Sequence, residues 1–408
     1  MVHDILVRNA RLRSGATVDI AIADGRYVAI ADGIKEGAAR ELDAGGNLVS
    51  ESFVIGQLHL DKVLTGDWMD RSAREQYFEG GMGGAMTAIE FAAAVKRRYQ
   101  EDEVLARIDR ALEYAALGGV THIRAFIDVD SKAELKGIKA ALRAREKWRD
   151  RLDLQVIAFP QDGLPREPGA EELLYESMEL GADLVGGIPW IEFTEADARR
   201  HVDIVFDIAE KYDKDVTMLL DDAGDAELRT SEYTATEAVR RGWVGRVVGC
   251  HMRASALYNE VYHRKWVELL KRAEMGIVTN PHTGPLHVRV KDLARAGIVI
   301  GLGGESVNDA YYPYGRCNML EAAFVSSHTL WAMDAADQEL LYDMITVNPA
   351  KLLRLSGHSI GAGNEANLVM LHGDSLRAAY THHREPRYVI YRGRLTAESE
   401  TSHTLHEL

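Results

Sequence analysis

The chain has 408 residues, of which 46% are hydrophobic and 27% are charged, and its formal net charge at pH 7 is −15. This composition predicts a globular protein with a large core, and the length suits an α/β barrel with additions better than one ordinary domain. The acidic charge argues against nucleic acid or an anionic membrane as a partner.

The two ends of the chain both show short strands separated by turns. Asp24-Gly25 is a strong hairpin-turn signal between two of the first strands. The predicted strands are residues 5–10, 18–22, 27–30, 366–371 and 388–391. We expect the two ends to pair into one small β-sandwich domain made of residues 1–50 and 360–408.

Between the two ends, apolar strands alternate with helical stretches, which is typical of βα units around a parallel sheet. The strand candidates begin at Phe53 and number eight, the count that closes a (β/α)8 TIM-type barrel. They cover residues 53–55, 121–128, 154–161, 184–189, 216–222, 246–251, 276–280 and 298–305. We therefore predict an α/β protein whose barrel spans residues 51–359.

Polar side chains gather where these strands end, and barrels of this kind place their chemistry at that edge. A single polar residue after a strand is commonly a turn former or a helix cap, but recurrence on successive strands favours a site. Tyr311 and Tyr312 are predicted to form an aromatic wall over it, or else to pack a loop. The strand-end residues are Gln57, His59, Asp61, Gln161, Asp221, Asp222, His251 and Glu305.

Location is indicated by the cysteines and by the apolar runs. Cys250 and Cys317 are the two cysteines of the chain, which fits a reducing compartment and no disulfide framework. No apolar run approaches the roughly 20 residues that span a bilayer, and the first residues do not form a signal peptide. We expect a cytoplasmic protein without a membrane partner.

The strand-end residues and the stretches around them, in their order and spacing, resemble the amidohydrolase superfamily and within it the cytosine deaminase branch. The resemblance extends over nearly the whole chain, so it implies a barrel enzyme acting on a small heterocyclic substrate and assembling as a homo-oligomer. It is carried by residues 57–61, 154–161, 181–189, 250–251, 258–259, 280–281, 312–320, 348–350 and 363–371.

The resemblance also assigns roles at the metal site, and the chain departs from them. The opening motif of the family has two metal-binding histidines, where this chain has Gln57 and His59. The third metal histidine corresponds to Leu219, and the metal-binding aspartate corresponds to Glu305. Since a catalytic zinc or iron site needs about three good protein ligands, we predict a function without a metal cofactor. The alternative is one divalent zinc or iron ion held by His59, His251 and Glu305.

The family residues that transfer protons and bind substrate match this chain better than the metal ligands do. Asp222 corresponds to the proton-shuttling glutamate of the family, His251 to the histidine that polarises water, and Gln161 to a glutamine that grips the pyrimidine ring. We predict Asp222, His251, Glu305 and His59 as catalytic residues. The predicted substrate-binding residues are Gln57, Gln161, Asp221, Tyr311 and Tyr312.

The leading functional hypothesis is hydrolysis of a C–N bond in a small nitrogen heterocycle or cyclic amide, by deamination or by ring opening. Three alternatives remain open at this point. The first is a metal-free lyase or isomerase that uses the same carboxylates for proton transfer. The second is a metal-dependent deaminase with unusual ligands, and the third is a barrel that binds a ligand without turning it over.

Overall fold

In the computed structural model, the described residues are 3–68, 75, 93, 95–309, 311–402 and 404–406. Eight parallel strands form one sheet in chain order, and a bridge from Leu58 to Glu305 joins the first strand to the segment that follows the last strand. The predicted (β/α)8 barrel is therefore confirmed. Its strands are β6 (Phe53–His59), β7 (Val120–Asp128), β8 (Asp153–Phe159), β9 (Leu184–Gly187), β10 (Asp215–Leu220), β11 (Val247–His251), β12 (Gly276–Thr279) and β13 (Ile300–Leu302).

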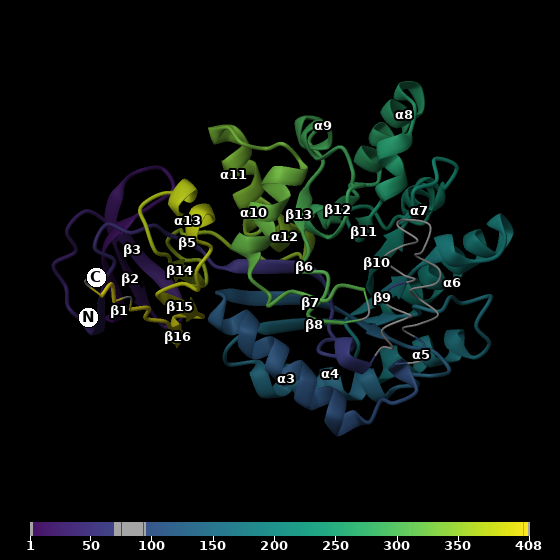
Figure 1. The fold of residues 1–408 in the computed structure, drawn as a ribbon, viewed down its shortest axis with the longest axis horizontal. Coiled ribbons are helices and arrows are strands. Elements are labelled where there is room, and N and C mark those ends of the chain that lie inside the picture. The colour runs from purple at the N-terminus through teal and green to yellow at the C-terminus, as the bar shows by residue number, and fades with distance from the viewer. Residues whose placement is uncertain are drawn as a thin grey trace.

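Helices surround the strands and follow them in alternation, as expected for βα units (Figure 1). The helical stretches predicted between the strands are present as helices. They are α3 (Glu101–Leu117), α4 (Lys136–Trp148), α5 (Ala170–Leu180), α6 (Glu195–Tyr212), α7 (Thr230–Arg240), α8 (Glu260–Arg272) and α9 (Val290–Arg295). Three further helices follow the barrel strands: α10 (Met319–Thr329), α11 (Ala335–Asp343) and α12 (Val347–Leu352).

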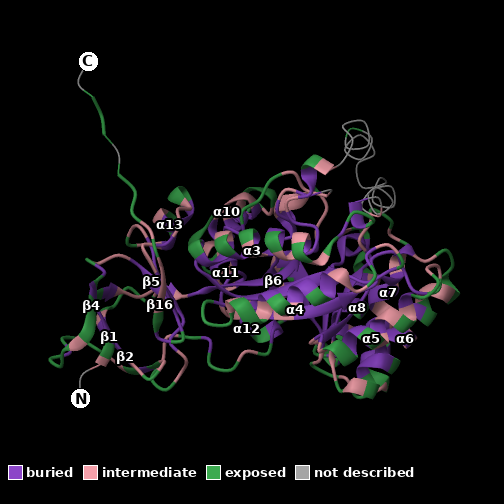
Figure 2. Ribbon diagram, turned by 90° about the horizontal axis from the view of Figure 1, so that it is seen from below, coloured by how far each residue is buried: buried purple, intermediate pink, exposed green. Residues whose placement is uncertain are grey.

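The barrel strands are buried on both faces, which explains why their sequences are nearly continuous apolar runs. The outer face packs against helices whose other sides are exposed to solvent (Figure 2). Inside the barrel, Phe126, Phe159, Leu219 and Val278 belong to one apolar cluster. This packed interior fills the barrel below its mouth, so polar chemistry is confined to the carboxyl ends of the strands.

The two ends of the chain form a pair of four-stranded sheets with the orders β3-β2-β1-β4 and β16-β15-β14-β5. Their inner faces share an apolar cluster, to which Ile5 and Ile20 contribute from one sheet and Leu368 and Ile390 from the other. In Figure 1 the purple and yellow segments lie side by side. The strands are β1 (His3–Arg11), β2 (Thr17–Ala23), β3 (Arg26–Ala31), β4 (Ala38–Asp43), β5 (Val49–Glu51), β14 (Leu368–Met370), β15 (Tyr388–Tyr391) and β16 (Arg394–Glu398), and α13 (Leu376–His382) follows β14.

The predicted hairpin turn is present between β2 and β3, where Asp24 and Gly25 have φ angles of 50° and 76°. Strands β4 and β16 were not predicted, because most of their residues are exposed or half-buried and give no apolar run. Strand β5 leads into β6 across a single residue, Ser52, so the small domain continues directly into the barrel. The domain limits at residues 50 and 360 stay a prediction.

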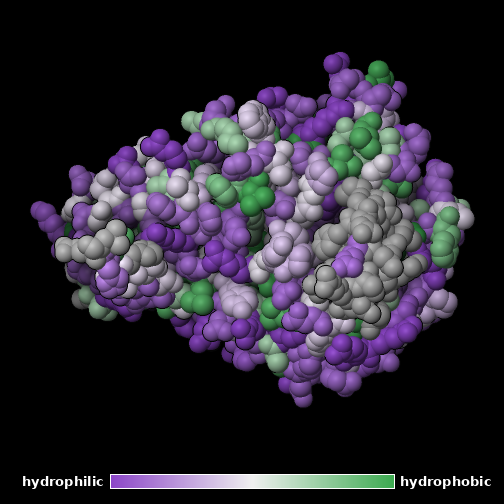
Figure 3. Space-filling view, viewed as in Figure 1, coloured by the Kyte–Doolittle hydropathy of each residue, from purple (hydrophilic) through white to green (hydrophobic). Residues whose placement is uncertain are grey.

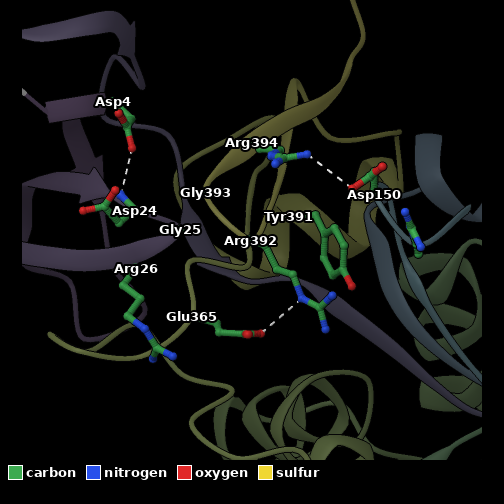
Figure 4. A pocket seen from close by; sticks show the side chains of 11 residues that line it. Asp4, Asp24, Gly25, Arg26, Asp150, Glu365, Tyr391, Arg392, Gly393 and Arg394 are labelled. Atoms are coloured by element: carbon green, nitrogen blue, oxygen red, sulfur yellow. Dashed lines mark hydrogen bonds and ion pairs between the residues drawn. The ribbon is translucent and has the colours of Figure 1, made fainter.

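A cleft of about 570 Å³ lies between the small domain and the barrel (Figure 4). Two ion pairs line it: Arg394 Nη1 lies 3.3 Å from Asp150 Oδ1, and Arg392 Nε lies 3.6 Å from Glu365 Oε2. Asp150 precedes β8, so the cleft lies at the amino end of the strands. It is therefore on the side opposite the predicted chemistry.

The surface is mainly polar, as the net charge suggests. On the face in Figure 3, hydrophilic residues predominate and apolar residues form small separate spots. No helix in the described ranges is both long enough and apolar enough to pass through a bilayer.

We expect Gly186→Ala to destabilise the protein, because a Cβ at Gly186 in β9 would lie 2.7 Å from Ala158 O and 3.1 Å from Phe159 Cα. Both atoms belong to the backbone of β8 and cannot move without disturbing the barrel. Overpacking of this kind costs about 1–3 kcal/mol or more of the free energy of unfolding, measurable by urea denaturation. Gly37→Ala is the control, since nothing lies within 4 Å of a Cβ there. Equal stability of the two variants would contradict the argument.

Candidate active site

The predicted site residues lie at the carboxyl ends of the barrel strands, and three of them have an unusual backbone. Asp221, His251 and Glu305 have φ angles of 47°, 65° and 57°. This left-handed region costs a residue with a side chain about 1–2 kcal/mol, and it turns the side chain away from the direction that a regular strand would give. Such strain is concentrated at functional positions.

The half-buried Asp222 forms one group with the buried Arg253 and His251 at the mouth of the barrel. Arg253 Nε lies 2.7 Å from Asp222 Oδ1, and Arg253 Nη2 lies 3.3 Å from His251 Nδ1. Because a guanidinium only donates, Nδ1 must be the accepting nitrogen of the imidazole. The neutral His251 ring therefore carries its proton on Nε2.

The Nε2 atom of His251 faces a second carboxylate, with Glu305 Oε2 at 3.3 Å. The Asn280 amide, from the end of β12, donates through Nδ2 to the same Glu305 oxygen at 2.6 Å. His251 thus lies between Asp222 and Glu305. The arrangement offers a carboxylate on either side of a ring that can donate from Nε2.

Burial controls the charges of this group. It raises the pKa of the Asp222 carboxyl to about 6, although the nearby Arg253 opposes the rise. It also raises the pKa of Glu305. Burial lowers the pKa of His251 to about 4, with Glu305 opposing the change and Arg253 adding to it. At neutral pH the site therefore holds a neutral imidazole beside an ionised Asp222.

His59 and Tyr311 form an aromatic wall beside this group. The His59 ring lies 5.6 Å from Phe126, 5.7 Å from Phe159 and 5.8 Å from Tyr311, measured between ring centroids. Burial lowers the pKa of His59 well below its usual value, and the Lys62 charge lowers it further. His59 is thus a neutral imidazole among aromatic rings.

Two other predicted substrate-binding residues, Gln161 and Tyr312, lie in different parts of the structure. Gln161 is buried after β8 and its Oε1 atom has no hydrogen-bond partner. Tyr312 lies on the same loop as Tyr311, and its ring contacts His282 at 6.4 Å between centroids. Both tyrosine amides donate to Asp309 Oδ1, which fixes the loop.

Asp221 requires a correction, because it does not offer its carboxylate to a substrate. Its Oδ1 accepts from the Thr230 amide at 2.7 Å and hydroxyl at 2.6 Å, and its Oδ2 accepts from Ser231 and from the Tyr258 hydroxyl. These donors occupy the lone pairs of both oxygens. Asp221 therefore holds the beginning of α7, and its neighbour Asp222 is the carboxylate of the site.

Behind the wall, a set of charges is sealed from solvent. Lys62 and Lys96 are fully buried, and each contacts the fully buried Asp128. Lys62 also lies 3.4 Å from Asp61, and Lys96 lies 2.8 Å from Asp162. We call these five residues the sealed charge cluster. It joins the ends of β6, β7 and β8 to the segment before α3.

Sequence reasoning missed Arg253, Asn280, Lys62 and Lys96. Two signals were available: Asp61 and Asp128 both follow or end apolar strands, so cations were needed nearby. Asn280 ends the predicted strand 276–280, and Arg253 lies two residues after the strand that ends at His251, but nothing in their spacing marks them as part of the site.

Comparison with known proteins now identifies the family. A model of the amidohydrolase family matches residues 55–397. The chain belongs to the amidohydrolase family. The resemblance drawn from the strand-end motifs is therefore confirmed.

Two relatives are similar over almost their full length. The amidohydrolase is 29% identical over 401 residues to N-isopropylammelide isopropyl amidohydrolase of Pseudomonas sp. strain ADP, covering 97% of this chain and 98% of the relative. It also matches the crystal structure of 5-methylcytosine deaminase from Klebsiella pneumoniae liganded with 5-fluorocytosine. That match has a TM-score of 0.90 and 28% identity, and covers 98% of this chain and 99% of the deaminase.

The prediction of a function without a metal cofactor is wrong. It was drawn from the loss of two metal-binding histidines, and that loss does not exclude a metal. Atrazine chlorohydrolase from Arthrobacter aurescens TC1 was solved as a complex with zinc, and it shares this fold. The match has a TM-score of 0.71 and 15% identity, and covers 97% of this chain and 95% of the hydrolase. A barrel of this fold thus holds zinc in that neighbour, and Gln57 and Leu219 do not establish a metal-free enzyme.

The donors of this amidohydrolase nevertheless do not fit the metal centre that the family implies. Within the described ranges, no three His, Cys, Asp or Glu side chains are close enough to hold one ion. Leu219 packs among apolar side chains inside the barrel, and Gln57 Oε1 already accepts from Asn280 Nδ2 at 2.6 Å. His59, His251 and Glu305, the alternative ligands, do not form such a group.

We expect Lys96→Met to be strongly destabilising in this amidohydrolase, because it removes the cation that pairs with the buried Asp130 and one of the two cations that contact Asp128. Removing one partner of a buried pair costs about 3–5 kcal/mol of the free energy of unfolding, which chemical denaturation measures. Arg149→Met is the control, since its ion pair with Glu146 is exposed. A cost for Lys96→Met no larger than for this control would show that the cluster is already neutralised by protonation.

Proposed function

We propose that this amidohydrolase hydrolyses a C–N bond of a small nitrogen heterocycle, releasing an amine. The observation that carries the proposal is the position of His251, with Asp222 Oδ1 3.8 Å from Nδ1 and Glu305 Oε2 3.3 Å from Nε2. A proton acceptor on each side of one ring suits a reaction in which water loses a proton and a leaving amine gains one. The relatives named an isopropyl amidohydrolase and a 5-methylcytosine deaminase support the substrate class.

In the proposed reaction, the Glu305 carboxylate and the Nε2–H of His251 orient a water molecule toward the ring carbon that bears the amine. The water oxygen forms a bond to that carbon while one of its protons passes to the ionised Asp222 carboxylate. Asp222 then delivers a proton to the departing nitrogen as the C–N bond breaks. Gln161 positions the ring, and His59 and Tyr311 pack against its face.

The buried environment supports these roles. Because burial raises the Asp222 pKa to about 6, its carboxylate is a stronger base than an exposed aspartate and returns a proton readily at neutral pH. His251 is neutral above about pH 4 and can therefore act as a hydrogen-bond donor without adding a second cation beside Arg253. Asp222 thus transfers the proton, whereas His251 and Glu305 orient the water molecule.

The direct test is turnover of a panel of amino- and alkylamino-substituted pyrimidines and triazines, followed by mass spectrometry of the products. We expect an amine to be exchanged for oxygen. Asp222→Asn should lower kcat by about 10²–10⁴-fold, the usual contribution of a positioned acid or base. Asp225→Asn, on the exposed part of the same loop, should leave it unchanged. Products of unchanged mass would favour isomerisation, and an active Asp222→Asn would remove Asp222 from the mechanism.

We also predict how Arg253 affects the pH dependence. Asp222 acts as a base only when ionised, so kcat/KM should rise with pH through about 6. Arg253 favours the carboxylate, and its removal in Arg253→Met must raise the Asp222 pKa further. The acid limb of the profile should then move up by about one pH unit or more, whereas Arg253→Lys, which keeps the charge, should move it less. An unmoved limb, or one displaced to lower pH, would show that another group controls it.

A further inference from the structure

Two amide side chains and one carboxylate form a closed arrangement in the wall of the site. Asn280 Nδ2 lies 2.6 Å from Gln57 Oε1 and 2.6 Å from Glu305 Oε2. The three residues come from the ends of β12, β6 and β13, and all three are buried. Asn280 therefore connects a strand residue of β6 to the carboxylate beside His251.

The hydrogen bonds fix which atom of each amide faces its partner. Asn280 turns its NH₂ group toward Glu305, because its Nδ2 atom donates to Glu305 Oε2. The second hydrogen of that NH₂ group points to Gln57, so Gln57 must present its carbonyl oxygen. This leaves the Gln57 NH₂ group as a donor, and its Nε2 atom is buried without a hydrogen-bond partner. Buried donors are almost always hydrogen-bonded, so this one is placed to meet an acceptor from outside the chain.

The backbone is shaped around this arrangement. A Cβ at Gly303 would lie 2.5 Å from Asn280 Oδ1 and 2.7 Å from Gln57 Oε1, so any side chain there would displace the amides. The main chain of Gln57 is held as well, because its carbonyl accepts from the Gly304 amide at 2.8 Å. Gln57 is thus fixed at both its backbone and its side chain.

The fixed amide reverses the polarity of this position relative to the family. A metal-binding histidine would turn a lone pair toward the site, whereas Gln57 turns N–H bonds. His59, two residues along the same strand, lies on the same face, and its Nδ1 is also buried without a partner. The wall of β6 therefore includes a directed donor next to a neutral imidazole.

We propose that Gln57 Nε2 binds a carbonyl oxygen on the heterocycle, and that Asn280 is the positioning residue that keeps the donor turned inward. The inference rests on the proposed function and narrows its substrate class to cyclic amides and ureides, which carry an exocyclic oxygen on the ring. An analogue with an amine in place of that oxygen would bring two donors together and leave both unpaired. Sites built to pair a polar group can reject such analogues by up to about 10⁴-fold.

The test is binding of matched ligands, measured by titration calorimetry so that turnover is not required. Pyrimidin-2-one and 2-aminopyrimidine form one pair, and cyanuric acid and melamine form another, each differing in oxygen against amine. We expect the wild-type protein to bind the oxygen member of at least one pair about tenfold or more tightly. Failure of both oxygen members to bind more tightly than their partners would overturn the proposal.

Variants distinguish the role of the donor, Gln57, from that of the residue that positions it, Asn280. In Gln57→Glu the donor becomes an acceptor of nearly the same shape, so the preference should invert toward the amine member. Asn280→Ala frees the Gln57 amide to turn either way, and it should reduce the preference without inverting it. Gln155→Glu, a glutamine of β8 bonded to Arg124 and Leu353, is the matched control and should keep the wild-type ratio. An unchanged ratio in Gln57→Glu would overturn the role of Gln57.

The result of this binding test is independent of the result of the turnover test for hydrolysis. Turnover that depends on Asp222, together with no preference for oxygen, would retain the proposed function and reject this inference. A preference that inverts in Gln57→Glu, together with no turnover of any amine, would retain the binding role and reject hydrolysis. Thermal unfolding of each variant, compared with the wild type, separates a lost preference from a lost fold.

Discussion

The site depends on the backbone hydrogen bonds that close the barrel between β6 and the segment after β13. The His59 amide donates to Glu305 O at 2.8 Å, and the Gly304 amide donates to Gln57 O at 2.8 Å. Because side chains alternate along a strand, these bonds bring Gln57, His59 and Glu305 to one side of the barrel mouth. The left-handed backbone of Glu305 then turns its carboxylate toward His251.

Two systems of charge share this end of the barrel without mixing. One belongs to β10, β11 and β13, and it consists of Asp222, Arg253, His251 and Glu305. The other is the sealed charge cluster at the ends of β6, β7 and β8. Tyr311 and His59 lie between the two, with the Lys62 ammonium 5.9 Å from the Tyr311 ring centroid. In a medium of low dielectric, both systems interact more strongly than they would in water.

The fold was predictable from the sequence because the barrel strands are buried on both faces and give long apolar runs between helices. The strand ends could be found because each apolar run stops where its strand leaves the core. What periodicity could not show is the direction of each side chain after a strand. Asp221 and Asp222 are adjacent and chemically identical, yet one anchors α7 and the other faces Arg253. The contacts of Arg253, Asn280 and Lys96 depend on long-range packing, and two missing ligands did not establish that a metal is dispensable.

The sealed charge cluster has a consequence for how this barrel can change over time. Barrels of this type diversify when one βα loop is altered independently of its neighbours. Here Lys62 and Lys96 follow β6, Asp128 ends β7 and Asp162 follows β8, yet these buried charges neutralise one another. New specificity can therefore arise readily around β10 to β13, whereas the connections after β6, β7 and β8 are inherited as one unit.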